Sequence, residues 1–265
     1  MDDQLHQLYR ELLSIIFPDG RAIFERIGTN DLCLTGYLKG KNYTGGLLIY
    51  GQAVNGWQNT AFHDTDALIQ EVLSNADDYH ALYPVVDPRG WHGEVDGIIA
   101  SYYYKRSKFW KLNYQVATRA ADPLFQDFYI RNPLDNCAFD AAWSQSVVWS
   151  NLYKVTFSKG GNPDSMIQKS IHDVSIRIVL REIDLLQPTQ VLFNTGKNYF
   201  EELFEDRFGL HQVSETGNIL YAGQYSTFSG SKCKMVVCKR PDEWKAKYTN
   251  NDIIREAEDI LKAFE

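Results

Sequence analysis

Short apolar runs that end at a small or polar residue constrain the fold of this chain more than any other feature. Four such runs occupy residues 47–50, 146–151, 190–196 and 234–238. A short, uninterrupted apolar run of this kind is typical of a strand that is buried on both faces. Helical spacing of apolar residues predicts helices between and around the runs, over residues 4–17, 65–75, about 98–121, 165–186, 199–208 and 252–264.

Alternation of strands and helices predicts an α/β fold with a three-layer α/β/α arrangement and a mainly parallel central sheet. The 265 residues contain no internal repeat and no linker-like composition. We therefore expect one domain over residues 1–265, with an inserted helical segment at about 65–125.

Charge and cysteine content restrict the compartment and the partners. The net charge is −7, so binding to a polyanion requires a local basic patch. No apolar run reaches the roughly 18 residues of a membrane span, and the first residues do not resemble a signal peptide. The four cysteines are scattered without metal-site spacing. These features indicate a cytoplasmic protein with no metal, no other cofactor and no membrane association.

Ligands of parallel α/β sheets bind outside the carboxyl ends of the strands, where the strand order reverses. This rule selects three loops, at residues 51–57, 151–163 and 239–244. In the first loop, Gly51 and Gly56 allow the backbone to approach a ligand, and Gln52 and Asn55 each offer a donor and an acceptor. An ordinary strand-to-helix turn explains the same residues.

Asn151 ends the second apolar run. A side-chain amide at the tip of a buried strand can form paired hydrogen bonds with the edge of a pyrimidine-like ring. In the alternative interpretation, Asn151 only satisfies backbone groups of its own turn.

The order of these short motifs resembles the uracil-DNA glycosylase superfamily over roughly residues 45–245. Gly51-Gln52 is similar to the family's first motif, and Asn151, Lys154 and Gly161-Asn162-Pro163 are similar to the second. The resemblance implies a uracil-DNA-glycosylase-like fold and a nucleobase flipped out of DNA. It implies that Gln52 and Asn151 bind the base, and that Lys154 and Asn162 contact the nucleic acid.

Two motif positions depart from the family. Ala53 stands where the family commonly has an Asp or Asn that positions the attacking water, so Asn55 is the nearest polar candidate. Lys239-Arg240 replaces the usual His of the last motif, which makes Arg240 the candidate for stabilising a departing base anion and Lys239 a nucleic-acid contact. Trp57, ahead of Phe62, is the expected stacking aromatic.

Residues 97–121 hold basic side chains interleaved with aromatic ones and no acidic residue. Lys105, Arg106 and Lys108 are the predicted contacts to single-stranded nucleic acid. A half-buried helix whose basic side chains pair with acidic groups elsewhere is the alternative.

The sequence supports three hypotheses. The first is a divergent DNA glycosylase that excises a damaged base and needs no cofactor. The second is a non-catalytic module that binds a nucleobase or nucleic acid, favoured by Ala53 and by the missing His. The third is an unrelated α/β protein that binds a small metabolite. The sequence does not indicate an oligomeric state.

Overall fold

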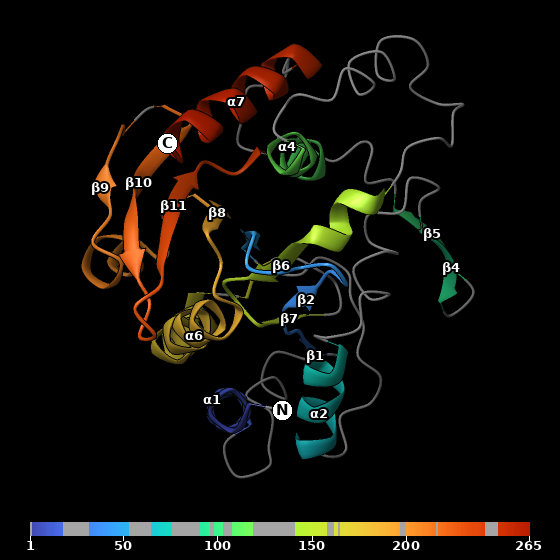
Figure 1. Cartoon of the computed structure of the whole chain (residues 1–265). Coiled ribbons are helices and arrows are strands. Elements are labelled where there is room, and N and C mark those ends of the chain that lie inside the picture. The colour runs from blue at the N-terminus through green and yellow to red at the C-terminus, as the bar shows by residue number, and fades with distance from the viewer. Residues whose placement is uncertain are drawn as a thin grey trace.

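A mixed α/β fold is seen in the computed structural model, with one main sheet and helices on both of its faces (Figure 1). The structure describes residues 2–17, 32–52, 65–75, 91–95, 98–102, 108–118, 141–157, 162–163, 165–196, 200–215, 217–241 and 249–265. Among these residues, no helix has the length and apolar character needed to cross a membrane.

The main sheet has seven strands, four of which are parallel and central. In spatial order they are β2 (Leu38–Lys39), β6 (Val147–Asn151), β3 (Leu47–Gly51), β8 (Gln190–Asn194), β11 (Lys232–Cys238), β10 (Ile219–Ser226) and β9 (His211–Gln212). Strands β6, β3, β8 and β11 pair in parallel, whereas β2, β10 and β9 pair antiparallel at the two edges. The predicted α/β class and the parallel centre are confirmed, and the edges make the sheet mixed.

Five α-helices lie within the described residues. They are α1 (Asp3–Ile16), α2 (Thr65–Asn75), α4 (Lys108–Ala117), α6 (Ser165–Leu186) and α7 (Asn250–Ala263). Two shorter helical turns, η4 (Ala141–Ser146) and η5 (Leu203–Arg207), accompany them. The predicted helices at 4–17, 65–75, 165–186 and 252–264 are confirmed within two residues of their expected ends.

The helix predicted over residues 98–121 is wrong in its first part. Ile98–Tyr102 forms β5, which pairs antiparallel with β4 (Trp91–Val95), and α4 begins only at Lys108. Isoleucine and tyrosine favour strands over helices, which accounts for the difference. The segment expected to be helical, at about 65–125, therefore contains a hairpin between two helices. The remaining short strands, β1 (Leu32–Leu34) and β7 (Val155–Phe157), pair with each other.

Residue alternation sends neighbouring side chains of the central strands to opposite faces. Leu48 and Tyr50 of β3 pack on the side of α1, α2 and α6, and Leu47 and Ile49 pack on the side of α4 and α7. Figure 1 shows the two groups of helices on either side of the sheet. Both faces of the central strands are buried, as the uninterrupted apolar runs predict.

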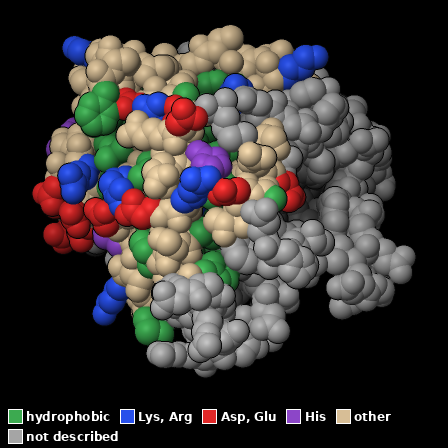
Figure 2. Space-filling model, turned by 90° about the horizontal axis from the view of Figure 1, so that it is seen from below, with side chains coloured by type: hydrophobic (Ala, Val, Ile, Leu, Met, Phe, Trp, Pro, Cys, Tyr) green, Lys and Arg blue, Asp and Glu red, His purple; other side chains and the backbone are tan. Residues whose placement is uncertain are grey.

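Charges of both signs mix on the outer surface of α1, α2 and α6. Figure 2 views the molecule from this side and shows Lys and Arg side chains next to Asp and Glu side chains. Arg177 pairs with Glu11, and Arg10 pairs with Asp66 at 2.8 Å. Pairing of this kind leaves no broad basic area among the described side chains of this face.

Candidate functional site

The strand order creates a switch point at β3. From β3 the chain goes to β6 on one side, and it then returns past β3 to β8 and β11 on the other side. In sheets of this kind, the crevice outside the carboxyl ends at the switch point is the usual ligand site. The three predicted loops begin at the ends of β3, β6 and β11; β3 and β6 are neighbours, and β8 lies between β3 and β11.

Gln52 connects the chain segments that meet at the switch point. Its Oε1 accepts hydrogen bonds from Asn162 Nδ2 at 2.8 Å and from Arg240 Nη1 at 2.5 Å. Its Nε2 donates to the carbonyl oxygen of Thr195 at 2.5 Å. The structure therefore brings Gln52 together with Asn162 and Arg240, each of which is more than a hundred residues from Gln52 in the sequence. These bonds occupy both ends of the Gln52 amide, so this side chain organises the edge.

Asn151 lies on the same edge, in register with Gly51. Its side chain is 2% exposed, and its Oδ1 has no hydrogen-bond partner among the described residues. A Cβ added to Gly51 would lie 2.6 Å from that Oδ1, which shows how closely the amide packs on the glycine. The turn is closed without this oxygen, because Leu152 N donates to Gly51 O at 2.9 Å and Tyr153 N donates to Gln52 O at 2.8 Å. Asn151 Oδ1 therefore does not bind the backbone of its own turn, as the alternative interpretation proposes.

The last residues of the four parallel strands form one row across the sheet. Gly51 pairs with Asn151 on one side, and Asn194 at the end of β8 pairs with Cys238 at the end of β11. By alternation, these positions face α4 and α7, as do Ile49, Trp149 and Leu192 two residues before them. Four strands thus end in a row of two amides, one glycine and one thiol.

A directed chain of hydrogen bonds continues this row into α4. The Cys238 thiol donates to Asn194 Oδ1 at 2.8 Å, and Asn194 Nδ2 donates to Asn113 Oδ1. Asn113 is fully buried, and its Nδ2 has no hydrogen-bond partner among the described residues. Sequence reasoning missed these three residues. The available signal was that β8, like β6, is a buried strand that ends in asparagine.

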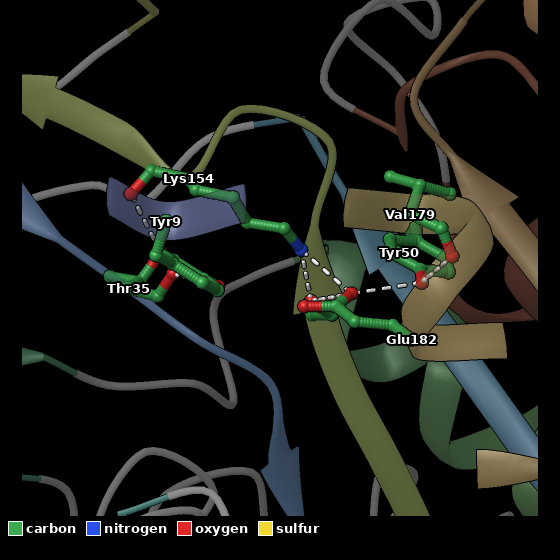
Figure 3. Close-up of polar contacts among 7 residues, drawn as sticks. Tyr9, Thr35, Tyr50, Lys154, Val179 and Glu182 are labelled. Carbon is green, nitrogen blue, oxygen red and sulfur yellow. Dashed lines mark hydrogen bonds and ion pairs between the residues drawn. The ribbon is translucent and has the colours of Figure 1, made fainter. Parts of the chain in front are cut away.

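Lys154 does not take the predicted role of a nucleic-acid contact. Its side chain is fully buried, and its ammonium donates to Glu182 Oε2 at 2.8 Å and to Ser150 Oγ at 2.7 Å. Tyr50 OH donates to the same Glu182 oxygen at 3.0 Å. Figure 3 shows the Lys154 ammonium directed at Glu182 of α6, with the Tyr50 hydroxyl at the carboxylate from the other side. Because a buried ion pair excludes contact with a polyanion, this prediction is wrong.

The Lys154–Glu182 ion pair fixes the turn that follows Asn151. The carbonyl oxygen of Lys154 also accepts a hydrogen bond from Thr35 N at 2.8 Å. Burial lowers the pKa of the Lys154 ammonium, and the Glu182 carboxylate opposes that shift. Burial, with Glu182 nearby, also raises the pKa of Tyr50, so its hydroxyl remains a donor at neutral pH. Tyr50 and Ser150 of this network directly precede Gly51 and Asn151, so the network supports the ends of β3 and β6.

The other predicted site residues divide into two groups. Lys239 and Arg240 follow β11 at the same edge, and Lys108 is the first residue of α4. Burial lowers the pKa of the neighbouring Lys111, which fits a partly buried helix. Predicted residues that lie outside the described part of the chain are Asn55, Trp57, Phe62, Lys105 and Arg106.

A comparison with models of known protein families and with curated proteins finds no match to this chain.

Proposed function

We propose that this protein binds a nucleobase of DNA at the switch point, with Asn151 as the residue that reads the base. One observation carries the proposal: a buried amide oxygen without a partner lies at the carboxyl end of β6, against Gly51. An unpaired buried acceptor is costly, and a ligand N–H removes that cost. The N–H of a uracil-type ring is a donor of the required kind.

The proposal includes a finer fold assignment, namely a three-layer α/β/α domain of the uracil-DNA glycosylase type. The central parallel strands, the helices on both faces and the order of the Gly51-Gln52, Asn151 and Asn162 positions support it. DNA is the proposed partner, and the cytoplasm is the proposed compartment. Because charges of both signs mix on the outer surface of α1, α2 and α6, this surface does not favour a polyanion. We therefore place the DNA contact at the edge of the sheet where the loops after β3, β6 and β11 begin.

The test is binding of a single-stranded oligonucleotide with one deoxyuridine, compared with the same strand carrying deoxycytidine instead. Tighter binding of the deoxyuridine strand is expected. Asn151→Ala should weaken that binding by roughly tenfold to a hundredfold, the effect of losing a partner in a buried hydrogen bond. Fluorescence anisotropy measures both affinities.

Asn42→Ala is the matched control, because Asn42 is an exposed asparagine whose Nδ2 donates to Gln145 near the amino end of β6. It should bind like the wild type. Equal affinity of the wild type for the two strands, or unchanged binding by Asn151→Ala, would contradict base recognition at this site.

Excision of the base is the second candidate function, and Arg240 favours it. The Arg240 guanidinium is held by Gln52 at the edge where a departing base would carry negative charge. In that reaction, the oxygen of a water attacks C1′ of the sugar, the C1′–N bond breaks, and the base leaves with the bonding electrons and takes up the proton that the water loses. Free uracil should then be released, at a rate lowered roughly a hundredfold in Arg240→Met. Binding without release would select the non-catalytic alternative.

A further inference from the structure

The side of α4 that faces the sheet covers the row of strand ends. A Cβ added to Gly51 would lie 3.6 Å from Phe109 Cζ, so the tip of that ring lies above the glycine. Asn113 follows Phe109 by four positions, on the same side of the helix, and is bonded to Asn194 of β8. The helix therefore places an aromatic ring over β3 and an amide over β8.

The direction of the hydrogen-bond chain fixes which group of Asn113 is left over. The Cys238 sulfur lies 2.8 Å from Asn194 Oδ1 and 3.6 Å from the carbonyl oxygen of Phe193, and the shorter contact goes with an Asn194 amide whose Nδ2 is directed at Asn113. Asn113 accepts this hydrogen bond with its Oδ1, and its Nδ2 is left as an unused donor. A buried N–H group without a partner carries the cost of an unmade hydrogen bond.

Two unused polar atoms of opposite kind thus lie on the side of the sheet that faces α4, one of them directly over Gly51. Asn151 of β6 holds an acceptor, and Asn113, bonded to Asn194 of β8, holds a donor. Asn151 ends β6, and Asn113 is bonded to the last residue of β8; β6 and β8 are the two strands that flank β3. An acceptor and a donor on the same side of the sheet can bind one planar heterocycle that carries an N–H and a C=O on its rim.

We propose that Asn113 is a second base-reading residue, which donates its Nδ2 hydrogen bond to a carbonyl oxygen of the ring whose N–H is bound by Asn151. Phe109, which is half-buried, supplies the apolar surface for the ring face. The substrate class is therefore a lactam-type base, with an N–H and a C=O on its rim, as in uracil or hypoxanthine. This inference rests on the proposed function and adds a residue to the same site.

The test combines a change in the ligand with a change in the protein. Oligonucleotides with deoxyuridine are compared with the 2-thio and 4-thio analogues, in which a weak sulfur acceptor replaces one carbonyl oxygen. Wild-type protein should lose roughly tenfold in affinity for one of the two analogues. Asn113→Leu, which has a similar volume and no amide, should bind uracil more weakly and no longer distinguish that analogue from uracil.

Gln115→Leu is the matched control. Gln115 is a similarly buried amide of α4 whose Nε2 is also without a partner among the described residues, but it lies about 200° around the helix from Asn113. It should keep the wild-type preference. If Asn113→Leu does not melt cooperatively, Asn113→Asp takes its place, because its carboxylate still offers an oxygen to Asn194.

The outcomes separate the two proposals. Loss of binding in Asn151→Ala, with an unchanged thio preference in the Asn113 variant, overturns the role of Asn113 and keeps the proposed function. Equal affinity of the wild type for uracil and for both thio analogues also overturns the role of Asn113, and this result needs no variant. Absence of base-dependent binding in the wild type overturns both proposals.

Discussion

Gly51 is required for its lack of a side chain and not for an unusual backbone conformation. It is absent from the described residues with positive φ, whereas the Asn151 oxygen occupies the place of a Cβ at 2.6 Å. Glycine at this position therefore allows the Asn151 amide to lie directly over the end of β3. Any other residue would displace the group proposed to read the base.

Gly51→Ala is expected to lower the free energy of unfolding by about 1–3 kcal/mol, the usual cost of overpacking. It should also weaken binding of the deoxyuridine strand, because Asn151 must move. Urea denaturation and anisotropy measure the two effects. Gly46→Ala is the control, since a Cβ there would meet Ser146 O at an ordinary 3.5 Å. Wild-type stability and binding in Gly51→Ala would refute the packing argument.

At the residue scale, the meeting of candidate residues at one edge was predicted from the sequence where a motif contained them. Gln52, Asn162 and Arg240 meet at one edge, and Asn151 lies on that edge, as the position of loops after parallel strands implies. Lys154 was misassigned because a sequence does not reveal that a lysine after a strand turns inward to a carboxylate 28 residues later. The Asn113–Asn194 contact joins a helix to a strand across 81 residues, and no local pattern encodes it.

At the scale of elements, the Lys154–Glu182 ion pair connects the end of β6 to α6. Ser150 and Tyr50 add hydroxyl donors from β6 and β3, so one carboxylate oxygen holds three elements together. A buried ion pair adds little net stability, because desolvation of the two charges offsets their attraction. Removing one partner is costly, because it leaves the other charge buried and unpaired.

Lys154→Met should therefore lower the free energy of unfolding by about 3–5 kcal/mol, because Glu182 is left without its cation. The double variant Lys154→Met/Glu182→Leu should regain most of that loss. Chemical denaturation measures both. Arg10→Met, which breaks the exposed pair with Asp66, is the control and should cost no more than about 1 kcal/mol. A double variant as unstable as Lys154→Met would contradict the account.

Elements with a clear period were predicted well, and elements that depend on pairing were not. The amphipathic α1 and α6 and the apolar β3 and β8 need only their own sequence to be identified. Strand β10, which lies between β11 and β9, was missed, because its burial alternates only weakly and its place is set by pairing with β11. The hairpin of β4 and β5 was missed for the same reason, since each strand exists only with the other.

For the molecule as a whole, two carboxylates that join α1 to α6 are expected to contribute to acid stability. Hydrogen bonding to Arg181 lowers the pKa of Asp2 below its ordinary 3.8, and hydrogen bonding to Arg177 lowers the pKa of Glu11 below 4.5. A carboxyl group with a lowered folded-state pKa stabilises the fold above its ordinary value. That stabilisation is lost as the pH falls through the lower, folded-state value.

Thermal melts from pH 7 to pH 3 should show this loss. The melting temperature of the wild type should fall more steeply below about pH 4.5 than that of the Asp2→Asn/Glu11→Gln variant, which lacks both groups. Asp3→Asn removes a carboxylate from the same helix end and controls for net charge. Parallel acid profiles of the wild type and the double variant would rule out a contribution from these groups.

The alternation of residues at the ends of β3 and β6 has a consequence for how the two strands are aligned. Tyr50 and Ser150 project to α6 and its carboxylate, while Gly51 and Asn151 project to α4. A slip of one position in either strand would turn a hydroxyl away from Glu182 and leave the buried charge under-solvated. The Lys154–Glu182 ion pair and its two hydroxyl donors therefore fix the register of β3 against β6. The same register determines where Gly51 and Asn151 lie in the row of strand ends.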